Sequence, residues 1–186
     1  MWCNGILIAG QKLPTLRTER LVLRPFEISD GARVKELAGN PKISETTAHI
    51  PYPYEEGMAE KWIITHPAEF AKGNGLTLAI TLLNGALIGA IALNTSPPDH
   101  KAEIGYWIGV SYWNQGYCTE AVRGMIHYGF NVLNYHKITA RYLAGNPASG
   151  RVMEKAGMKK EGELADDVCR NGKFHAVAVY GLLSSS

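Results

Sequence analysis

The dipeptide Asn84-Gly85 stands between two β-rich runs, Leu76–Leu82 and Ala86–Leu93, and this arrangement limits the fold more than any other local pattern. Asn-Gly between such runs is a strong hairpin turn signal. The two runs are therefore predicted to pair as antiparallel neighbours. The sheet of this chain must contain at least this hairpin.

Other segments require crossovers as well as hairpins. Thr119–Leu133 has a helical period and lies between two predicted strands, Lys101–Val110 and Lys137–Leu143. A helix between two strands is typical of a crossover connection. A second hairpin is predicted near the C-terminal end, around Asn171-Gly172. The predicted fold class is a mixed α/β domain whose central sheet holds both kinds of connection.

The first third of the chain is predicted to hold one strand and two helices. Leu21–Phe26 alternates in hydrophobicity and is assigned as a strand. A helix is expected over Ala32–Ala38, followed by a loop over residues 41–54 with room for a short helix. Glu55–Ala71 is expected to form the second helix, although Pro67 inside it would remove a backbone hydrogen bond.

Length and charge favour one folded domain. The 186 residues suit a single domain, and 46% hydrophobic residues are enough for a substantial core. Nineteen basic residues against seventeen acidic ones leave a net charge of +2, without a run of Lys or Arg, so direct nucleic-acid binding is not predicted. We expect residues 1–13 to be a poorly ordered leader and residues 14–186 to form the domain.

The apolar and cysteine content predicts a cytoplasmic protein. The apolar stretch Ile6–Ala9 is too short to span a membrane and shorter than the core of a signal peptide. Cys3, Cys118 and Cys169 are odd in number and widely spaced, which predicts no disulfide framework. No set of His, Cys, Asp and Glu has metal-ligand spacing, so no metal is expected.

The segment Trp113–Ala121 leads from a predicted strand into a predicted helix. Such a junction exposes backbone N–H groups at the positive end of a helix, which suits a phosphate anion. Gly116 allows close approach of the main chain, and Thr119 adds a hydroxyl donor. The segment lacks the P-loop lysine and the G-x-G-x-x-G pattern, so from physics alone an ordinary turn capped by Thr119 is the simpler interpretation.

Five segments together resemble a known family. Asn146–Met158 and Tyr112–Ala121 resemble the GNAT superfamily of N-acetyltransferases. Leu16–Phe26, Glu103–Ile108 and His136–Ala140 resemble the branch of that superfamily that acetylates the N-terminal residue of ribosomal proteins. The five matches occur in the expected order over most of the chain, and their combination is far more specific than any one of them.

The resemblance implies acetyl-coenzyme A as the cosubstrate and a GNAT fold. In that fold the sheet is mostly antiparallel and helices flank it. The strand Lys101–Val110 would splay from its parallel neighbour Lys137–Leu143 and leave a V-shaped gap for the pantetheine arm. Backbone groups of Ile108 and Val110 would hydrogen-bond the arm as an added strand would.

The resemblance also assigns the other cofactor contacts. Asn146 would meet the pantetheine arm, and Ser149 would lie near the thioester sulfur. Five consecutive N–H groups would hold the pyrophosphate: those of Gln115, Gly116, Tyr117, Cys118 and Thr119.

Four positions depart from the family's pattern. Trp113 stands where Gln or Arg is usual, Cys118 replaces a Gly or Ala, and Met153 occupies the place where many relatives have a tyrosine general acid. These three changes are ordinary within the ribosomal branch, and Cys118 is expected to pack and not to act as a nucleophile. His175 is followed by Ala176 in place of the Asp that the branch often shows, which puts one supporting contact in doubt.

Two residues are the candidates for catalysis. Glu103 is expected to act as the general base through water, and a cross-strand ion pair is the competing interpretation. Ser149 is expected to donate a proton or a hydrogen bond to the leaving thiolate. Its competing interpretation is a first-turn helix residue whose hydroxyl bonds the backbone.

The predicted acceptor is the N-terminal amine of a protein, in a pocket lined by Tyr52, Tyr54 and Trp62. About a tenth of an α-amino group is neutral at pH 7, against a few parts in ten thousand for a lysine. Two alternatives stay open: a small-molecule amine such as a polyamine, an antibiotic or an amino acid, and a non-catalytic acyl-CoA-binding module. A homodimer through a sheet edge is compatible with the sequence.

Overall fold

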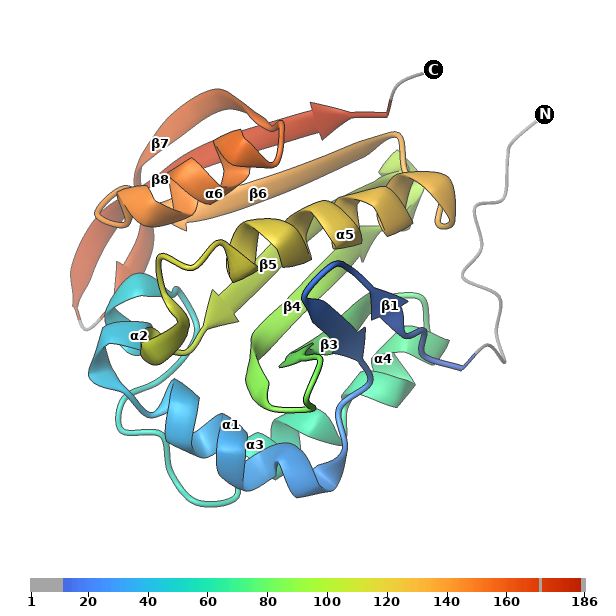
Figure 1. Ribbon diagram of the computed structural model, residues 1–186. Coiled ribbons are helices and arrows are strands. Elements are labelled where there is room, and N and C mark those ends of the chain that lie inside the picture. Colours follow the sequence, from blue (N-terminus) through green and yellow to red (C-terminus); the bar gives the residue numbers. More distant parts are fainter. Residues whose placement is uncertain (1–11, 171, 185–186) are drawn as a thin grey trace.

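The computed structural model describes residues 12–170 and 172–184 (Figure 1). Most of the expected leader, residues 1–11, lies outside the described residues, whereas Leu13 packs against the main core. No helix in the described part of the chain is long and apolar enough to cross a membrane.

One sheet of eight strands forms the centre of the molecule, in the spatial order β1-β2-β3-β4-β5-β6-β8-β7. Every neighbouring pair is antiparallel except β5 and β6, which are parallel. The predicted mixed sheet, with both its hairpins, is thereby confirmed. The strands are β1 Leu16–Arg17, β2 Leu21–Arg24, β3 Gly75–Leu82, β4 Leu87–Ser96, β5 Lys101–Ile108, β6 Lys137–Leu143, β7 Lys159–Arg170 and β8 Lys173–Leu183.

Helices cover both faces of the sheet. Figure 1 shows α5 crossing strands β4 and β5, with α6 beside it. Helices α1 and α3 pack together, and α1 contacts β4. The helices are α1 Gly31–Ala38, α2 Pro41–Thr46, α3 Met58–Ile63, α4 His66–Ala71, α5 Tyr117–Asn131 and α6 Pro147–Lys155, and the short 3-10 turns are η1 Ile28–Asp30, η2 Pro97–Asp99 and η3 Val110–Tyr112.

The side chains of β5 serve two separate cores, because successive residues of a strand point to opposite faces of the sheet. Ile104 and Ile108 belong to the main core, which also contains Met125 of α5. Trp107 packs instead against the smaller core under α1 and α3, which includes Val34. Residues of β5 with even numbers therefore face α5, and those with odd numbers face α1 and α3.

Strands β5 and β6 separate after a short parallel ladder. The ladder joins Lys101–Ile104 to Lys137–Ala140. Beyond it, β5 stays paired with β4 as far as Ile108, and β6 stays paired with β8 as far as Leu143. Each strand thus follows a different neighbour, and the sheet opens between them, as the resemblance implied.

The predicted helix over Glu55–Ala71 is wrong as a single element. The structure has two short helices, α3 and α4, with Ile64 and Thr65 between them. Pro67 lies in the first turn of α4, where its missing N–H has no intrahelical partner to lose. A proline that is unfavourable inside a long helix is therefore well placed at the start of a second one.

His66, at the start of α4, is the buried histidine of the described chain. It is 6% exposed, and neither ring nitrogen has a hydrogen-bond partner among the described residues. Its ring packs against Trp62, at 4.4 Å between centroids, and Phe26, at 5.4 Å, and these two rings also contact each other. Burial in this apolar contact disfavours the imidazolium and lowers the pKa of His66 to about 4.

We expect His66 to make the fold sensitive to acid. The unfolded chain takes up a proton below about pH 6.5 and the folded chain only near pH 4, so stability falls as the pH drops through that window. Between about pH 7 and pH 4.5 the loss should be on the order of 2–3 kcal/mol. Urea denaturation of His66→Leu should show a flatter pH profile, whereas the exposed His136→Asn control should keep it. An equal acid loss in His66→Leu would contradict the assignment.

Candidate active site

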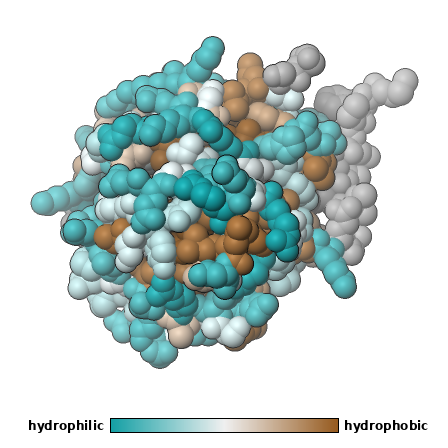
Figure 2. Space-filling model, viewed as in Figure 1, coloured by the Kyte–Doolittle hydropathy of each residue, from teal (hydrophilic) through white to brown (hydrophobic). Residues whose placement is uncertain are grey.

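A cavity of about 730 Å³ lies where β5 and β6 separate. Its lining includes Ile104 and Tyr106 from the α5 side of the sheet, and Glu103 and Trp107 from the other side. The cavity therefore connects the two faces through the gap. Figure 2 shows apolar residues gathered in the middle of the face that α5 crosses, ringed by hydrophilic ones. The volume is in the ordinary range for a small-molecule site.

The gap brings together most of the residues expected to form the site. Val110, Gln115 and Tyr117 do not line the cavity with the others. The expected residues in its wall are Glu103, Ile108, Gly116, Cys118, Thr119, Asn146 and Ser149.

The junction before α5 has the backbone shape of an anion site. Asn114 and Gly116 have φ angles of +61° and +81°, and Gly116 is the N-cap residue of the 15-residue helix. Positive φ at these two positions turns the chain so that the free N–H groups of the first helical turn point outward. The predicted strand-loop-helix junction is thus present, and its residues Gly116, Cys118 and Thr119 line the cavity.

Arg20, which precedes β2, holds this junction from a distance of about a hundred residues in sequence. Its Nη1 donates to the carbonyl of Gln115 at 3.0 Å, and its Nε donates to the carboxylate of Glu120 at 2.7 Å. Glu120 also accepts from the hydroxyl of Thr18 at 2.7 Å. This clamp went unnoticed in the sequence, because nothing local relates residue 20 to the start of α5.

Trp113 closes the end of β5. Its indole N–H donates to the carbonyl of Ile108 at 2.6 Å, so that carbonyl is occupied. The N–H of Gly109 donates to Ile88 of β4, and hydrogen-bonding direction alternates along a strand, so the N–H of Ile108 faces the gap. Val110 lies in η3, where its carbonyl accepts from the N–H of Trp113. The expected strand ends at Ile108, two residues earlier than predicted.

Asn146 is the N-cap of α6, and Pro147 occupies the first turn as the sequence favours. Its side-chain oxygen accepts from the N–H of Ser149 at 3.4 Å, and its amide nitrogen donates to the carbonyl of Thr46 at 3.1 Å. Asn146 therefore ties α6 to the end of α2 across the cavity wall.

Ser149 meets a tyrosine from the opposite side of the gap. Its Oγ lies 2.9 Å from the hydroxyl oxygen of Tyr106, which also lies 3.2 Å from the Ser149 carbonyl oxygen. Met153, at the position of the family's tyrosine, is 1% exposed and belongs to the main core. The neighbouring Cys118 packs against that core, and burial raises the pKa of its thiol to about 12. That thiol stays protonated at neutral pH.

Glu103 belongs to a row of charges on the face of the sheet opposite to α5. Its Oε2 lies 3.0 Å from Nε of Arg141, whose Nη1 lies 3.7 Å from Oδ2 of Asp167. The cross-strand ion pair is thus present, and the same carboxylate lines the cavity. With more than a third of each partner exposed, the pair contributes at most about 1 kcal/mol to stability.

Asp167 reaches Arg141 because β7 is irregular. The register between β7 and β8 shifts between Leu164 and Val168, and Asp166 has a φ angle of +51°. A bulge of this kind redirects side chains and is frequent beside functional sites. Sequence reasoning did not identify Asp167, because alternation is lost at a bulge. It did not identify Arg141, because its partners Glu103 and Asp167 lie on other strands.

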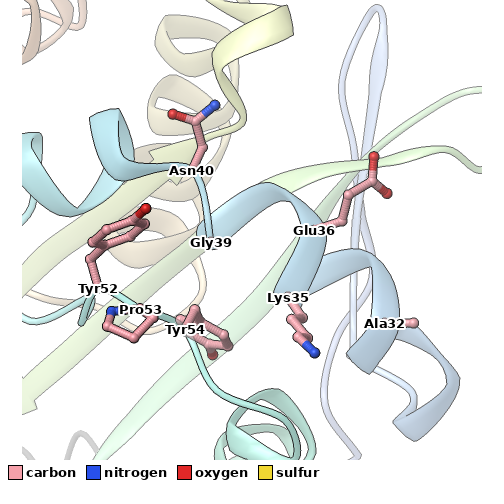
Figure 3. A pocket seen from close by; sticks show the side chains of 8 residues that line it. All are labelled: Ala32, Lys35, Glu36, Gly39, Asn40, Tyr52, Pro53 and Tyr54. Carbon is pink, nitrogen blue, oxygen red and sulfur yellow. The ribbon is translucent and has the colours of Figure 1, made fainter.

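The expected acceptor aromatics divide between two places. Trp62 lines the cavity, next to the segment that follows α2. Tyr52 and Tyr54 line a separate surface pocket against Lys35 and Glu36 of α1 (Figure 3). The prediction that these two tyrosines line the same pocket as Trp62 is therefore wrong, because the loop before α3 packs on the outer side of α1.

A mostly antiparallel sheet, a single parallel pair that splays beside a cavity, and a helix N-terminus next to the gap are the arrangement that the resemblance to the acetyl-CoA-dependent N-acetyltransferases implied. Residues 20–159 match the family described as the acetyltransferase (GNAT) domain. This match covers more than half of the chain, so the chain belongs to the GNAT acetyltransferases. The predicted family, fold and enzyme class are confirmed.

Relatives and solved structures agree with this placement. The chain is 39% identical over 176 residues to "Probable N-acetyltransferase YjcK" of Bacillus subtilis, covering 91% of this chain and 97% of that protein. It is 31% identical over 101 residues to the ribosomal-protein-serine acetyltransferase of Escherichia coli, covering 54% of this chain and 56% of that protein. RimL, a ribosomal L7/L12 α-N-protein acetyltransferase solved with coenzyme A, superposes with a TM-score of 0.83 at 20% identity, covering 92% and 98% of the two chains.

Proposed function

We propose that this enzyme transfers the acetyl group of acetyl-CoA to the N-terminal amine of a cytoplasmic protein. The observation that carries the proposal is the cavity through the sheet, which has Glu103 on one side of the gap and Ser149 on the other. A thioester carbonyl placed in that gap would have a proton acceptor on the face where the amine arrives. It would have a hydroxyl on the face where the thiolate leaves.

The same geometry supports the proposed cofactor contacts. The pyrophosphate lies at the N–H groups of residues 115–119, where the backbone turns at Gly116. The pantetheine arm lies in the gap, where the N–H of Ile108 faces it. Asn146 lies beside this path, already bonded to Thr46, so it holds the α2 segment against the cofactor channel.

Each residue then has a defined role in the reaction. Glu103 accepts the proton of the attacking amine through a water molecule, while the C–N bond forms. As the C–S bond breaks, its electron pair goes to sulfur, and Ser149 donates a hydrogen bond to the thiolate. The proton taken from the amine passes through solvent to the thiolate, so the balanced products are the amide and the free thiol of coenzyme A.

The charges of Glu103, Arg141 and Asp167 disfavour an acceptor that carries a carboxylate beside its amine. Two carboxylates, those of Glu103 and Asp167, flank the single guanidinium of Arg141. The N-terminal residue of a protein carries one positive charge, and its carboxyl group is part of an uncharged peptide bond. A free amino acid would bring a third carboxylate into this row, which like-charge repulsion disfavours. The similarity to a ribosomal-protein-serine acetyltransferase supports the same acceptor.

The test is a comparison of acceptors with acetyl-CoA, read as release of free thiol and by mass spectrometry of the products. We expect acetylation of short peptides that carry the free N-termini of ribosomal proteins. The same peptides with a blocked N-terminus and an internal lysine should be far poorer acceptors. Turnover with spermidine, an aminoglycoside or a free amino acid, without turnover of the peptides, would favour the small-molecule alternative. Tight binding of acetyl-CoA without thiol release from any amine would identify a non-catalytic acyl-CoA-binding module.

A further inference from the structure

The pair formed by Tyr106 and Ser149 is the closest contact between hydroxyl groups in the cavity wall, at 2.9 Å between oxygens. Tyr106 comes from β5, and Ser149 comes from the first turn of α6, on the far side of the gap. The ring of Tyr106 packs against the main core, which fixes its position. No signal in the sequence relates these two residues, which are 43 positions apart.

Two hydrogen-bond patterns are compatible with the positions of these oxygens. In the first, Tyr106 donates to the Ser149 carbonyl at 3.2 Å, and the serine hydroxyl donates to the tyrosine oxygen. In the second, Tyr106 donates to Ser149 Oγ, and the serine proton is free to point into the cavity. The two patterns differ only in rotation of hydroxyl protons, so the change between them requires no movement of heavy atoms.

Negative charge on a sulfur atom beside Ser149 selects the second pattern. The serine proton turns towards the charge, and the tyrosine hydroxyl then supports the serine oxygen as a donor. Hydrogen bonds in such a chain polarise one another, so the serine becomes a stronger donor than an isolated hydroxyl. Burial raises the pKa of Tyr106 well above its ordinary value, so the tyrosine keeps its proton and acts only as a hydrogen-bond donor.

We propose that Tyr106 is a positioning residue that acts through Ser149 to stabilise the departing coenzyme A thiolate. Tyr106 thus supports, from β5, the serine hydroxyl that faces the leaving group, in a chain that has Met153 at the usual tyrosine position. This inference rests on the proposed function, because it requires the thioester sulfur to lie beside Ser149. No proton is transferred from Tyr106 at any step.

The thiol pKa of bound coenzyme A tests the proposal without an acceptor amine. It is measured from the ultraviolet absorbance of the thiolate, with the complex of desulfo-coenzyme A as the blank for protein cysteines. In the wild type this pKa should lie below that of free coenzyme A. Ser149→Ala should raise it by about one to two units, the effect of losing one hydrogen bond to a charged group. Tyr106→Phe should raise it by roughly half that amount, and the double variant should match Ser149→Ala.

Turnover should follow the same order. Tyr106→Phe should lower kcat by roughly tenfold and Ser149→Ala by about tenfold to a thousandfold, with small changes in KM for acetyl-CoA, because the contact strengthens only as charge develops. Tyr135→Phe is the matched control. It removes another buried hydroxyl, one bonded to Thr95, that does not line the cavity. It should lower the melting temperature and leave the thiol pKa and kcat unchanged.

The outcomes separate this inference from the proposed function. A wild-type thiol pKa in Tyr106→Phe, with wild-type kcat, would overturn the role of Tyr106. A pKa equal to that of free coenzyme A in every protein would overturn the roles of both hydroxyls. If the thiol pKa shifts as expected but no amine is acetylated, the hydroxyl pair stands and the proposed acceptor reaction fails.

Discussion

Replacing Glu103 with Gln should lower turnover by about 10² to 10⁴ while leaving acetyl-CoA affinity within a few-fold of wild type. The substitution keeps the shape of the side chain and removes its capacity to accept a proton. Glu103 lies in the last part of the parallel ladder, opposite Thr139, immediately before the sheet opens. A carboxylate at that point reaches the gap from the face opposite Ser149. Steady-state kinetics with the best peptide acceptor, together with calorimetry for acetyl-CoA, measure the two quantities.

The ion pair with Arg141 requires its own control. Arg141→Gln breaks the pair at 3.0 Å but keeps the Glu103 carboxylate. If the carboxylate is the base, turnover in Arg141→Gln should fall much less than in Glu103→Gln. Equal losses in the two variants would show that the pair matters only as a structural link. Near-wild-type turnover of Glu103→Gln across neutral pH would place the base elsewhere or leave water alone to accept the proton.

Replacing Gly116 with Asp should abolish measurable binding of acetyl-CoA, a loss of at least about 100-fold. The new carboxylate would stand at the helix N-terminus that the pyrophosphate needs, and like charges repel there. The position also has a φ angle of +81°, and a Cβ would come within 3.3 Å of the Arg20 guanidinium, which supports the loop. Isothermal titration calorimetry measures the affinity, and circular dichroism shows whether melting stays cooperative.

Two further glycine variants distinguish charge from strain. Gly116→Asn has a similar shape and tolerance of positive φ but no charge, so it should retain part of the affinity. Gly85→Asp places the same residue at a φ of +88° in the distant β3–β4 hairpin, where a Cβ meets no atom within 4 Å. It should bind acetyl-CoA as the wild type does. Unchanged affinity in Gly116→Asp would refute the placement of the pyrophosphate.

Turn and capping chemistry were readable in the sequence because each signal lies within a few residues. Asn84 and Gly85 lie in the turn between β3 and β4, where Gly85 has a positive φ, the conformation that glycine adopts without strain. Asn146 and Pro147 begin α6 because a capping side chain and a fixed φ favour a helix start. The alternation along Lys101–Val110 predicted a strand, which the structure shows over Lys101–Ile108, and the main core takes its even-numbered side chains. These features depend on backbone preferences that a short segment expresses by itself.

Contacts that join distant segments could not be predicted in the same way. The clamp of Arg20 on Glu120 spans 100 residues, and the Tyr106–Ser149 pair joins a strand to a helix across the gap. The β7 bulge that carries Asp167 towards Arg141 breaks the alternation from which a side-chain direction would be inferred. Tyr52 was assigned to the wrong pocket for a related reason, since its loop follows the outer side of α1.

The sequence by itself determined the main strands and both hairpins, and its resemblance to the GNAT acetyltransferases determined the class of reaction. It did not determine that two helices, α3 and α4, replace the single helix predicted over Glu55–Ala71. Only the tertiary structure decided which side chains meet in the gap between β5 and β6. The physical reason is that strand pairing and helix packing set the distance between Glu103 and Arg141, or between Tyr106 and Ser149. Those distances depend on the divergence of two strands, each held by a different neighbour in the sheet.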